Sequence, residues 1–141
     1  NHSIKVQFIE SISANRQKYR SKNGNYIQAF GLFKFKQVKF EPEPDYFVFA
    51  FRNPQKKLPA YLIIPEVKLE RRHIKSSSDH TQYKLIKIVF WVMTDGSVFD
   101  TTNISAEGEW YYMSKGNYGR MADKTVMDYS QFLNNWDTLR L

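Results

Sequence analysis

Residues 46–51 read YFVFAF, and all six side chains are apolar or aromatic. A strand with one face in water alternates apolar and polar residues, because successive side chains point to opposite faces of the sheet. A strand that is apolar at every position is typical of the middle of a sheet whose two faces are both covered. We therefore predict that 46–51 is a central strand and that the rest of the chain packs around it.

Other segments rich in β-branched and aromatic residues favour further strands. We expect them at 4–9 (IKVQFI), 32–40 (LFKFKQVKF), 60–64 (AYLII) and 85–93 (LIKIVFWVM), with shorter ones at 98–104 and 109–113. In 32–40 the lysines alternate with apolar residues, which indicates a half-exposed strand with a wet lysine face.

Two helices are expected. Pro65 followed by EVKLERRHI predicts a short helix, because Pro is favourable in a first turn. The segment 128–141 has a capping-box-like start and apolar residues at helical spacing, and 75–82 is a loop by composition. The prediction is an α+β domain over residues 1–141, with a mixed, mostly antiparallel sheet of five or six strands and one or two packed helices.

The charge of the chain is unevenly distributed. The 141 residues carry a net charge of +7, but residues 1–75 hold 15 Lys and Arg against 6 Asp and Glu, whereas residues 76–141 hold 6 against 8. This asymmetry favours a polyanionic partner for the first half, with nucleic acid as the main candidate. Cysteine is absent, which excludes disulfides, thiolate metal sites and a cysteine nucleophile.

No apolar run reaches the ~18–20 residues of a membrane helix, and the N-terminus lacks the apolar region of a signal peptide. We therefore expect a cytoplasmic protein with no membrane partner. The chain begins without Met, which indicates either a processed chain or an excised fragment.

Residues 44–46 read PDY and residues 65–68 read PEVK, which together spell the Pro-Asp and Glu-x-Lys motif of metal-dependent nucleases. Phosphodiester hydrolysis of this kind uses carboxylates to hold a hard cation, usually Mg²⁺, and a cation to stabilise developing charge. Asp45, Glu66 and Lys68 are therefore candidate catalytic residues, with Asp45 and Glu66 as candidate Mg²⁺ ligands.

The PEVK segment can instead be a turn or the start of a helix, with no catalytic role. Pro65 cannot donate to a neighbouring strand, so a central active-site strand through 65–68 conflicts with it. In a helix, Glu66 and Lys68 would project about 200° apart and would not converge. The segment KQVK at 36–39 has the same ambiguity, because it is either a Gln-x-Lys form of the motif or an amphipathic edge strand.

The order of segments resembles the C-terminal portion of a restriction-endonuclease-like domain of bacterial proteins. The resemblance rests on DYFVFAF at 45–51, YLIIP at 61–65 and FLNNWDTL at 132–139, and it spans about residues 4–64 and 126–139. It implies a restriction-endonuclease-like fold and a relationship to nucleases.

The resemblance also places the family's Gln-x-Lys strand at 5–9, which reads KVQFI. Gln7 takes the Gln position, and Ile9 stands where the family has Lys. The family's acidic metal ligand would precede this strand, and the chain begins too close to the strand to contain it. The resemblance therefore implies either a fragment that lacks its first elements or a diverged copy that binds without cutting, in which Asp45 is a strand-start residue.

Two basic clusters are candidates for phosphate contact, one around Tyr19 in 15–25 and one in 68–75. In a helix, Lys68 and three later cations of the second cluster would share one face; the alternative is an ordinary solvated surface. The candidate nucleic-acid-binding residues are Arg16, Lys18, Tyr19, Arg20, Lys22, Arg71, Arg72 and Lys75.

The segment 107–121 combines Trp110 and three tyrosines with three glycines, which is typical either of a binding loop or of aromatics buried against a sheet. The sequence as a whole predicts a nucleic-acid-binding protein, with Mg²⁺-dependent hydrolysis if Asp45, Glu66 and Lys68 form a site. The alternative is a non-catalytic interaction domain of a larger assembly, in which 107–121 docks a partner protein.

Overall fold

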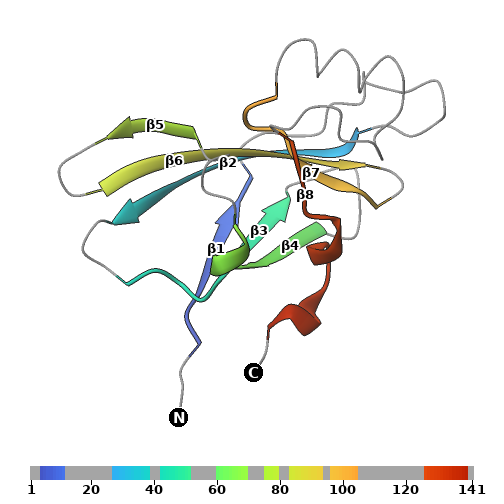
Figure 1. The fold of residues 1–141 in the computed structure, drawn as a ribbon, viewed down its shortest axis with the longest axis horizontal. Coiled ribbons are helices and arrows are strands. Elements are labelled where there is room, and N and C mark those ends of the chain that lie inside the picture. The colour runs from blue at the N-terminus through green and yellow to red at the C-terminus, as the bar shows by residue number, and fades with distance from the viewer. Residues whose placement is uncertain are drawn as a thin grey trace.

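A computed structural model of the chain describes residues 4–11, 27–38, 42–51, 60–69, 75–79, 83–93, 96–104 and 126–139. These residues form strands in two sheets, connected or extended by short 3-10 turns (Figure 1). The smaller sheet has the order β1 (Val6–Glu10), β3 (Tyr46–Phe51), β4 (Ala60–Pro65). β1 is parallel to β3, and β4 is antiparallel to it.

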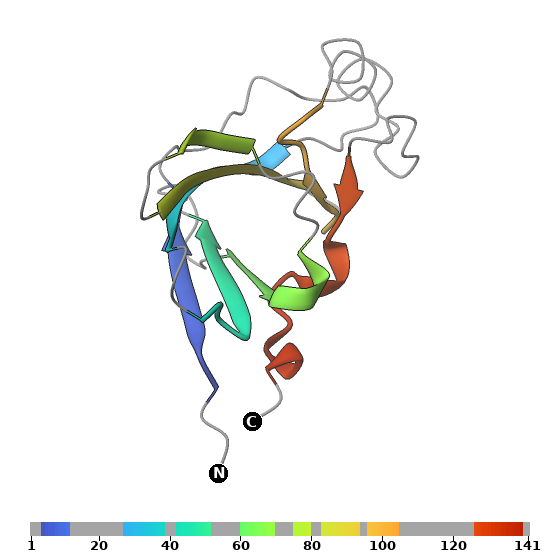
Figure 2. The same cartoon turned by 60° about the vertical axis from the view of Figure 1, so that its left-hand side comes forward.

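The larger sheet is antiparallel throughout and is built on two long strands. β2 (Ile27–Val38) pairs with β6 (Tyr83–Met93) along its whole length. The other edge of β6 pairs first with β5 (Lys75–Asp79) and then with β7 (Val98–Asp100), which pairs with β8 (Met127–Asp128). Figure 2 shows the two sheets curving around one interior, which η1 (Glu66–Lys68) and the segment 126–139 close on one side.

The prediction for 46–51 is confirmed. β3 is the middle strand of the smaller sheet, and Phe47, Val48 and Phe49 are all buried, so both of its faces are covered. Its Phe side chains face the larger sheet and meet Phe33 of β2. The apolar run in the sequence thus marks the place where the two sheets pack against each other.

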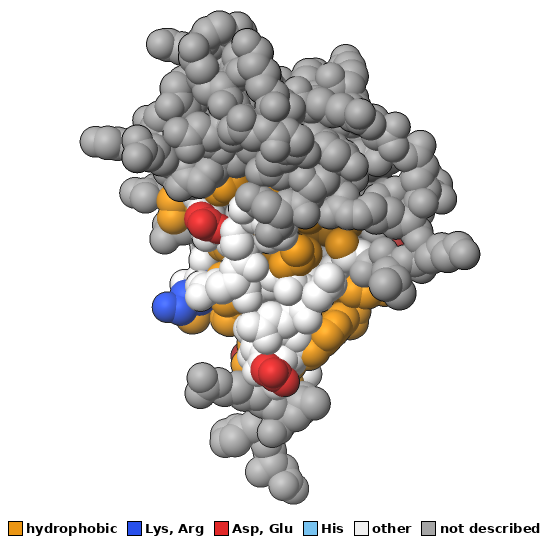
Figure 3. All heavy atoms as spheres, turned by 90° about the vertical axis from the view of Figure 1, so that its right-hand side faces the viewer, with side chains coloured by type: hydrophobic (Ala, Val, Ile, Leu, Met, Phe, Trp, Pro, Cys, Tyr) orange, Lys and Arg blue, Asp and Glu red, His pale blue; other side chains and the backbone are white. Residues whose placement is uncertain are grey.

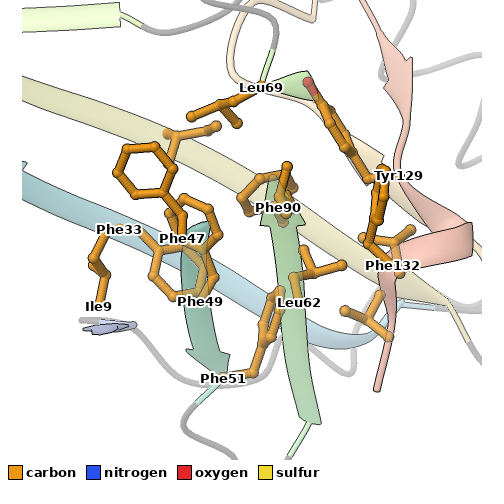
Figure 4. Packing of buried hydrophobic residues seen from close by; sticks show 14 residues of the cluster. Ile9, Phe33, Phe47, Phe49, Phe51, Leu62, Leu69, Phe90, Tyr129 and Phe132 are labelled. Carbon is orange, nitrogen blue, oxygen red and sulfur yellow. The ribbon is translucent and has the colours of Figure 1, made fainter. Parts of the chain in front are cut away.

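Phe33 lies at the centre of the core (Figure 4). Its ring centroid is 5.1 Å from that of Phe49, 5.1 Å from that of Phe51 and 5.9 Å from that of Phe90, all in edge-to-face geometry. Edge-to-face pairs place the positive edge of one ring on the negative face of another. Gly31 makes room for this cluster, because a Cβ there would come within 2.5 Å of the Phe33 and Phe51 rings.

The C-terminal helix predicted over 128–141 is wrong. Residues 130–132 and 136–138 form two separate 3-10 turns, η3 (Ser130–Phe132) and η4 (Trp136–Thr138). Asn134 between them has a φ of 51°, a left-handed conformation that Asn tolerates. Its backbone N–H donates to the Tyr61 carbonyl (2.7 Å), and the Tyr61 N–H donates to its side-chain Oδ1 (2.9 Å). The segment therefore covers the outer edge of β4 instead of forming a helix.

The helix predicted after Pro65 is also wrong, because η1 has three residues and Leu69 already has an extended backbone (φ −77°, ψ 114°). Leu69 is buried in the core, which holds the chain extended at this point. The loop predicted at 75–82 contains strand β5. The described residues are mostly β-sheet and include no helix of seven or more residues. We predicted one sheet with one or two packed helices, but these residues form two mostly antiparallel sheets.

Asp100 is a carboxylate buried at the end of β7, with no exposed surface. Its Oδ1 accepts hydrogen bonds from the Thr102 amide and hydroxyl, but its Oδ2 has no hydrogen-bond partner among the described residues. Burial raises the pKa of Asp100 from 3.8 to about 7, and the two hydrogen bonds from Thr102 offset part of that rise.

None of the helices within the described segments is long and apolar enough to cross a bilayer.

The first prediction concerns the pH dependence of folding. Because the folded-state pKa of Asp100 lies above its unfolded value, the folded state holds the extra proton between pH 4 and 7 and stability falls as pH rises through that window. We expect the free energy of unfolding to drop by about 2–3 kcal/mol between pH 5 and pH 8. Urea denaturation of wild type and Asp100→Asn at both pH values measures this; an equal drop in the variant would contradict the assignment.

Candidate nucleic-acid interface

The two acids of the nuclease-like motif lie side by side. Asp45 precedes β3 and Glu66 follows β4, and the Glu66 N–H donates to the Asp45 carbonyl (2.9 Å). The Asp45 carboxylate has a structural partner, because its Oδ2 accepts a hydrogen bond from the Lys5 amide (2.9 Å). Asp45 thus holds the start of β1 against β3.

Lys68 and Glu66 are two residues apart in the 3-10 turn η1, so their side chains leave the turn about 120° apart. Within the described ranges there is no group of three or more His, Asp or Glu side chains arranged to hold a metal ion. Mg²⁺ is usually bound by one or two carboxylates together with waters and substrate phosphates, and one of the two acids here already accepts a backbone hydrogen bond.

Most of the predicted nucleic-acid-binding residues lie outside the described residues. These are Arg16, Lys18, Tyr19, Arg20, Lys22, Arg71 and Arg72, and the segment 107–121 lies outside them as well. The helical face that would group Lys68 with Lys75 does not form, because the turn ends at Lys68 and Lys75 begins strand β5.

The larger sheet instead brings together lysines that are not among the candidate binding residues. In the strand register Lys34 of β2 lies opposite Lys87 of β6, and Lys87 lies opposite Lys75 of β5. Lys36 follows two residues after Lys34, and its ammonium lies 4.6 Å from the centroid of the Tyr83 ring. We call Lys34, Lys36 and Lys87 the lysine patch.

The lysine patch is electrostatically unfavourable for the isolated protein. Directly opposite residues on adjacent strands have Cβ atoms about 4.5–5.5 Å apart, and like charges in such pairs destabilise a sheet. Lys34 and Lys36 are exposed and Lys87 is half-buried. Lys34 and Lys87 are therefore two like charges directly opposite each other, and a polyanion would relieve their repulsion.

A groove lies beside the lysine patch, between the outer strand of each sheet. It has a volume of about 350 Å³ and runs between the first half of β1 and the last four residues of β2. Lys36 lines the groove and belongs to the patch as well. The Pro42–Pro44 segment and Phe47 complete its wall.

Large apolar side chains are exposed at several places on the described surface, namely Val67 (83%), Phe8 (65%), Trp136 (44%) and Val38 (38%). Phe8 and Val38 both line the groove. On the face that carries β8 and the C-terminal turns, apolar side chains form patches among backbone and uncharged polar atoms, with a few charged groups (Figure 3).

The sequence contained a signal for the lysine patch. The alternation in 32–40 correctly placed Lys34 and Lys36 on an exposed strand face. Lys87 stands in a similar alternation within β6, but its pairing with Lys34 depends on the register of two strands separated by more than 40 residues. The lysine patch lies on the larger sheet and not on the sheet that contains 46–51.

Comparisons with known protein families, with curated proteins and with solved structures found no match to this chain.

The second prediction concerns the stability of the lysine patch. Lys34→Glu replaces a like-charge pair with an opposite-charge pair facing Lys87, and we expect the free energy of unfolding to rise by about 0.5–1 kcal/mol at low salt. The gain should shrink in high salt, because screening weakens both the repulsion of the two lysines in wild type and the attraction of the opposite charges in the variant. Urea denaturation at low and high NaCl measures it.

Lys84→Glu is the matched control for that substitution. Lys84 is exposed on β6, but its register partners are Gln37 and Asp79, so the same reversal there should not stabilise the fold. An equal gain in both variants would show that net charge, and not the pair of opposed lysines, sets the effect.

Proposed function

We propose that this protein binds nucleic acid and that the lysine patch contacts its phosphates. The observation that carries the proposal is the pair of Lys34 and Lys87, which the register places directly opposite each other on β2 and β6, with Lys36 two residues farther along β2. A nucleic-acid backbone is a repeating row of negative charges, so it complements a group of neighbouring cations better than an isolated anion does.

The overall charge supports the same partner. A net charge of +7 raises the local concentration of a polyanion around the chain, and each phosphate that a lysine neutralises releases counterions. The proposal does not depend on the basic segments 15–25 and 70–74, although cations there would add to the same attraction.

We infer binding without cleavage. Under the resemblance to restriction-endonuclease-like domains, Ile9 occupies the position of the motif lysine, and Ile9 is buried in the core. The Asp45 carboxylate is engaged by the Lys5 amide. We also propose a relationship to that superfamily, which the order of the sequence segments supports. The packed helices that this relationship implies are absent from the described residues.

The third prediction tests phosphate contact through the salt dependence of binding. Removing two phosphate contacts with the double variant Lys34→Ala/Lys87→Ala should reduce the slope of log Kobs against log salt by about 1.4–1.8. Fluorescence anisotropy of a labelled oligonucleotide over a series of NaCl concentrations measures the slope.

The matched control is Lys68→Ala/Lys84→Ala, which lowers the net charge by the same amount outside the lysine patch. We expect its slope to change much less. If the control lowers the slope as much as Lys34→Ala/Lys87→Ala does, long-range charge and not the lysine patch drives binding; if the protein binds no oligonucleotide, the proposed function is wrong.

The fourth prediction concerns cleavage. We expect supercoiled plasmid to stay intact when it is incubated with the protein and Mg²⁺ or Mn²⁺, because the Glu66 and Lys68 side chains leave the turn about 120° apart and the Asp45 carboxylate already accepts the Lys5 amide. Gel electrophoresis reads the result. Cutting that disappears in both Asp45→Ala and Glu66→Ala would instead establish these residues as catalytic.

A further inference from the structure

The groove between β1 and β2 combines an exposed aromatic ring with hydrogen-bonding groups. Phe8, 65% exposed, stands at its β1 side, and Val38, 38% exposed, at its β2 side. Gln7, Gln37 and Glu43 supply amide and carboxylate groups to its lining. Its volume of about 350 Å³ is at the lower end of the ~300–1,000 Å³ typical of small-molecule sites.

We propose that the groove holds one unpaired base of a single-stranded nucleic acid, stacked on Phe8, while the phosphates next to it contact the lysine patch. This inference rests on the proposed function and specifies its substrate as single-stranded. Base stacking on an exposed aromatic ring is the usual way in which proteins hold single strands without strict sequence preference.

The polar groups of the groove suit a base better than a phosphate. Gln37 Nε2 donates to Glu43 Oε1 at 2.8 Å, which orients both side chains. The oxygens of Gln37 and Glu43 are hydrogen-bond acceptors, and the amino and ring N–H groups of a base are donors. A carboxylate in the lining would repel a phosphate, so the phosphates are expected outside the groove.

Lys36 connects the groove to the lysine patch. It lines the groove and follows Lys34 by two residues on the exposed face of β2. The Tyr83 ring lies 4.6 Å from its ammonium, a favourable cation–π contact. When one base of a nucleic-acid strand stacks on Phe8, the lysines along β2 are therefore placed to contact the phosphates that follow it.

An inserted peptide strand fits the groove less well. The Cα atoms of β1 and β2 come within 8 Å of each other. Two strands that flank a third lie about 9.6 Å apart, because neighbouring strands are spaced by about 4.8 Å. Paired bases in a duplex are stacked and cannot enter the groove, so the occupant is an unpaired base.

The fifth prediction compares a short fluorescein-labelled DNA strand with the duplex of the same sequence by anisotropy. Phe8→Ala should weaken binding of the single strand about 5- to 150-fold, since stacking on an aromatic ring contributes that much per base, and change duplex binding less than about 2-fold. Phe8→Tyr keeps a ring and should bind like wild type. Val67→Ala, which removes an exposed apolar side chain away from the groove, is the control.

A strand in which abasic sites replace the bases separates stacking from a structural role of Phe8. Wild type should bind that strand as weakly as Phe8→Ala does, and the two proteins should no longer differ on it. The inference is overturned if Phe8→Ala binds the normal strand with the affinity of wild type. It is also overturned if the substitution lowers the affinity for the abasic strand and the duplex as much as for the normal strand. In both cases oligonucleotide binding by wild type would leave the proposed function standing.

Discussion

The edge-to-face contact of Phe33 with the rings of β3 holds the two sheets together. The smaller sheet has three strands and the described ranges contain no long helix, so neither sheet has a helix layer to cover its inner face. Each sheet must therefore bury that face against the other. The rings of Phe33, Phe49, Phe51 and Phe90 fill the interior, and Gly31 leaves the space they need.

This packing explains which parts of the fold are predictable from sequence. A period-two pattern or an unbroken apolar run reports local burial, so β1, β3, β4 and β6 were found close to their observed bounds. The segment 128–141 has helical spacing, but Asn134 bonds to both backbone groups of Tyr61, which lies more than 70 residues earlier. That tertiary contact overrides the local propensity, and sequence spacing carries no trace of it.

The candidate site was predictable to a smaller extent for the same reason. Asp45 and Glu66 do meet, because they lie at matching ends of adjacent antiparallel strands, but their meeting follows from the β3–β4 pairing and supports that pairing through a backbone hydrogen bond. The Asp45 carboxylate and the Glu66 backbone therefore have structural roles. The pairing of Lys34 with Lys87, by contrast, weakens the sheet, since opposed lysines repel each other. A feature that opposes folding is a better guide to binding than one that supports it.

The placement of the sheet edges adds to this argument. An unpaired edge strand invites pairing with another chain, and proteins protect such edges with charges or by covering them. The outer edge of β4 is covered by Asn134 and Leu133. The outer strands β1 and β2 instead face each other across the groove, with Lys34 and Lys36 exposed along β2. Covering this groove as well would have hidden Phe8 and Lys36, so the groove stays open where an aromatic ring and the cations of the lysine patch lie within reach of one ligand.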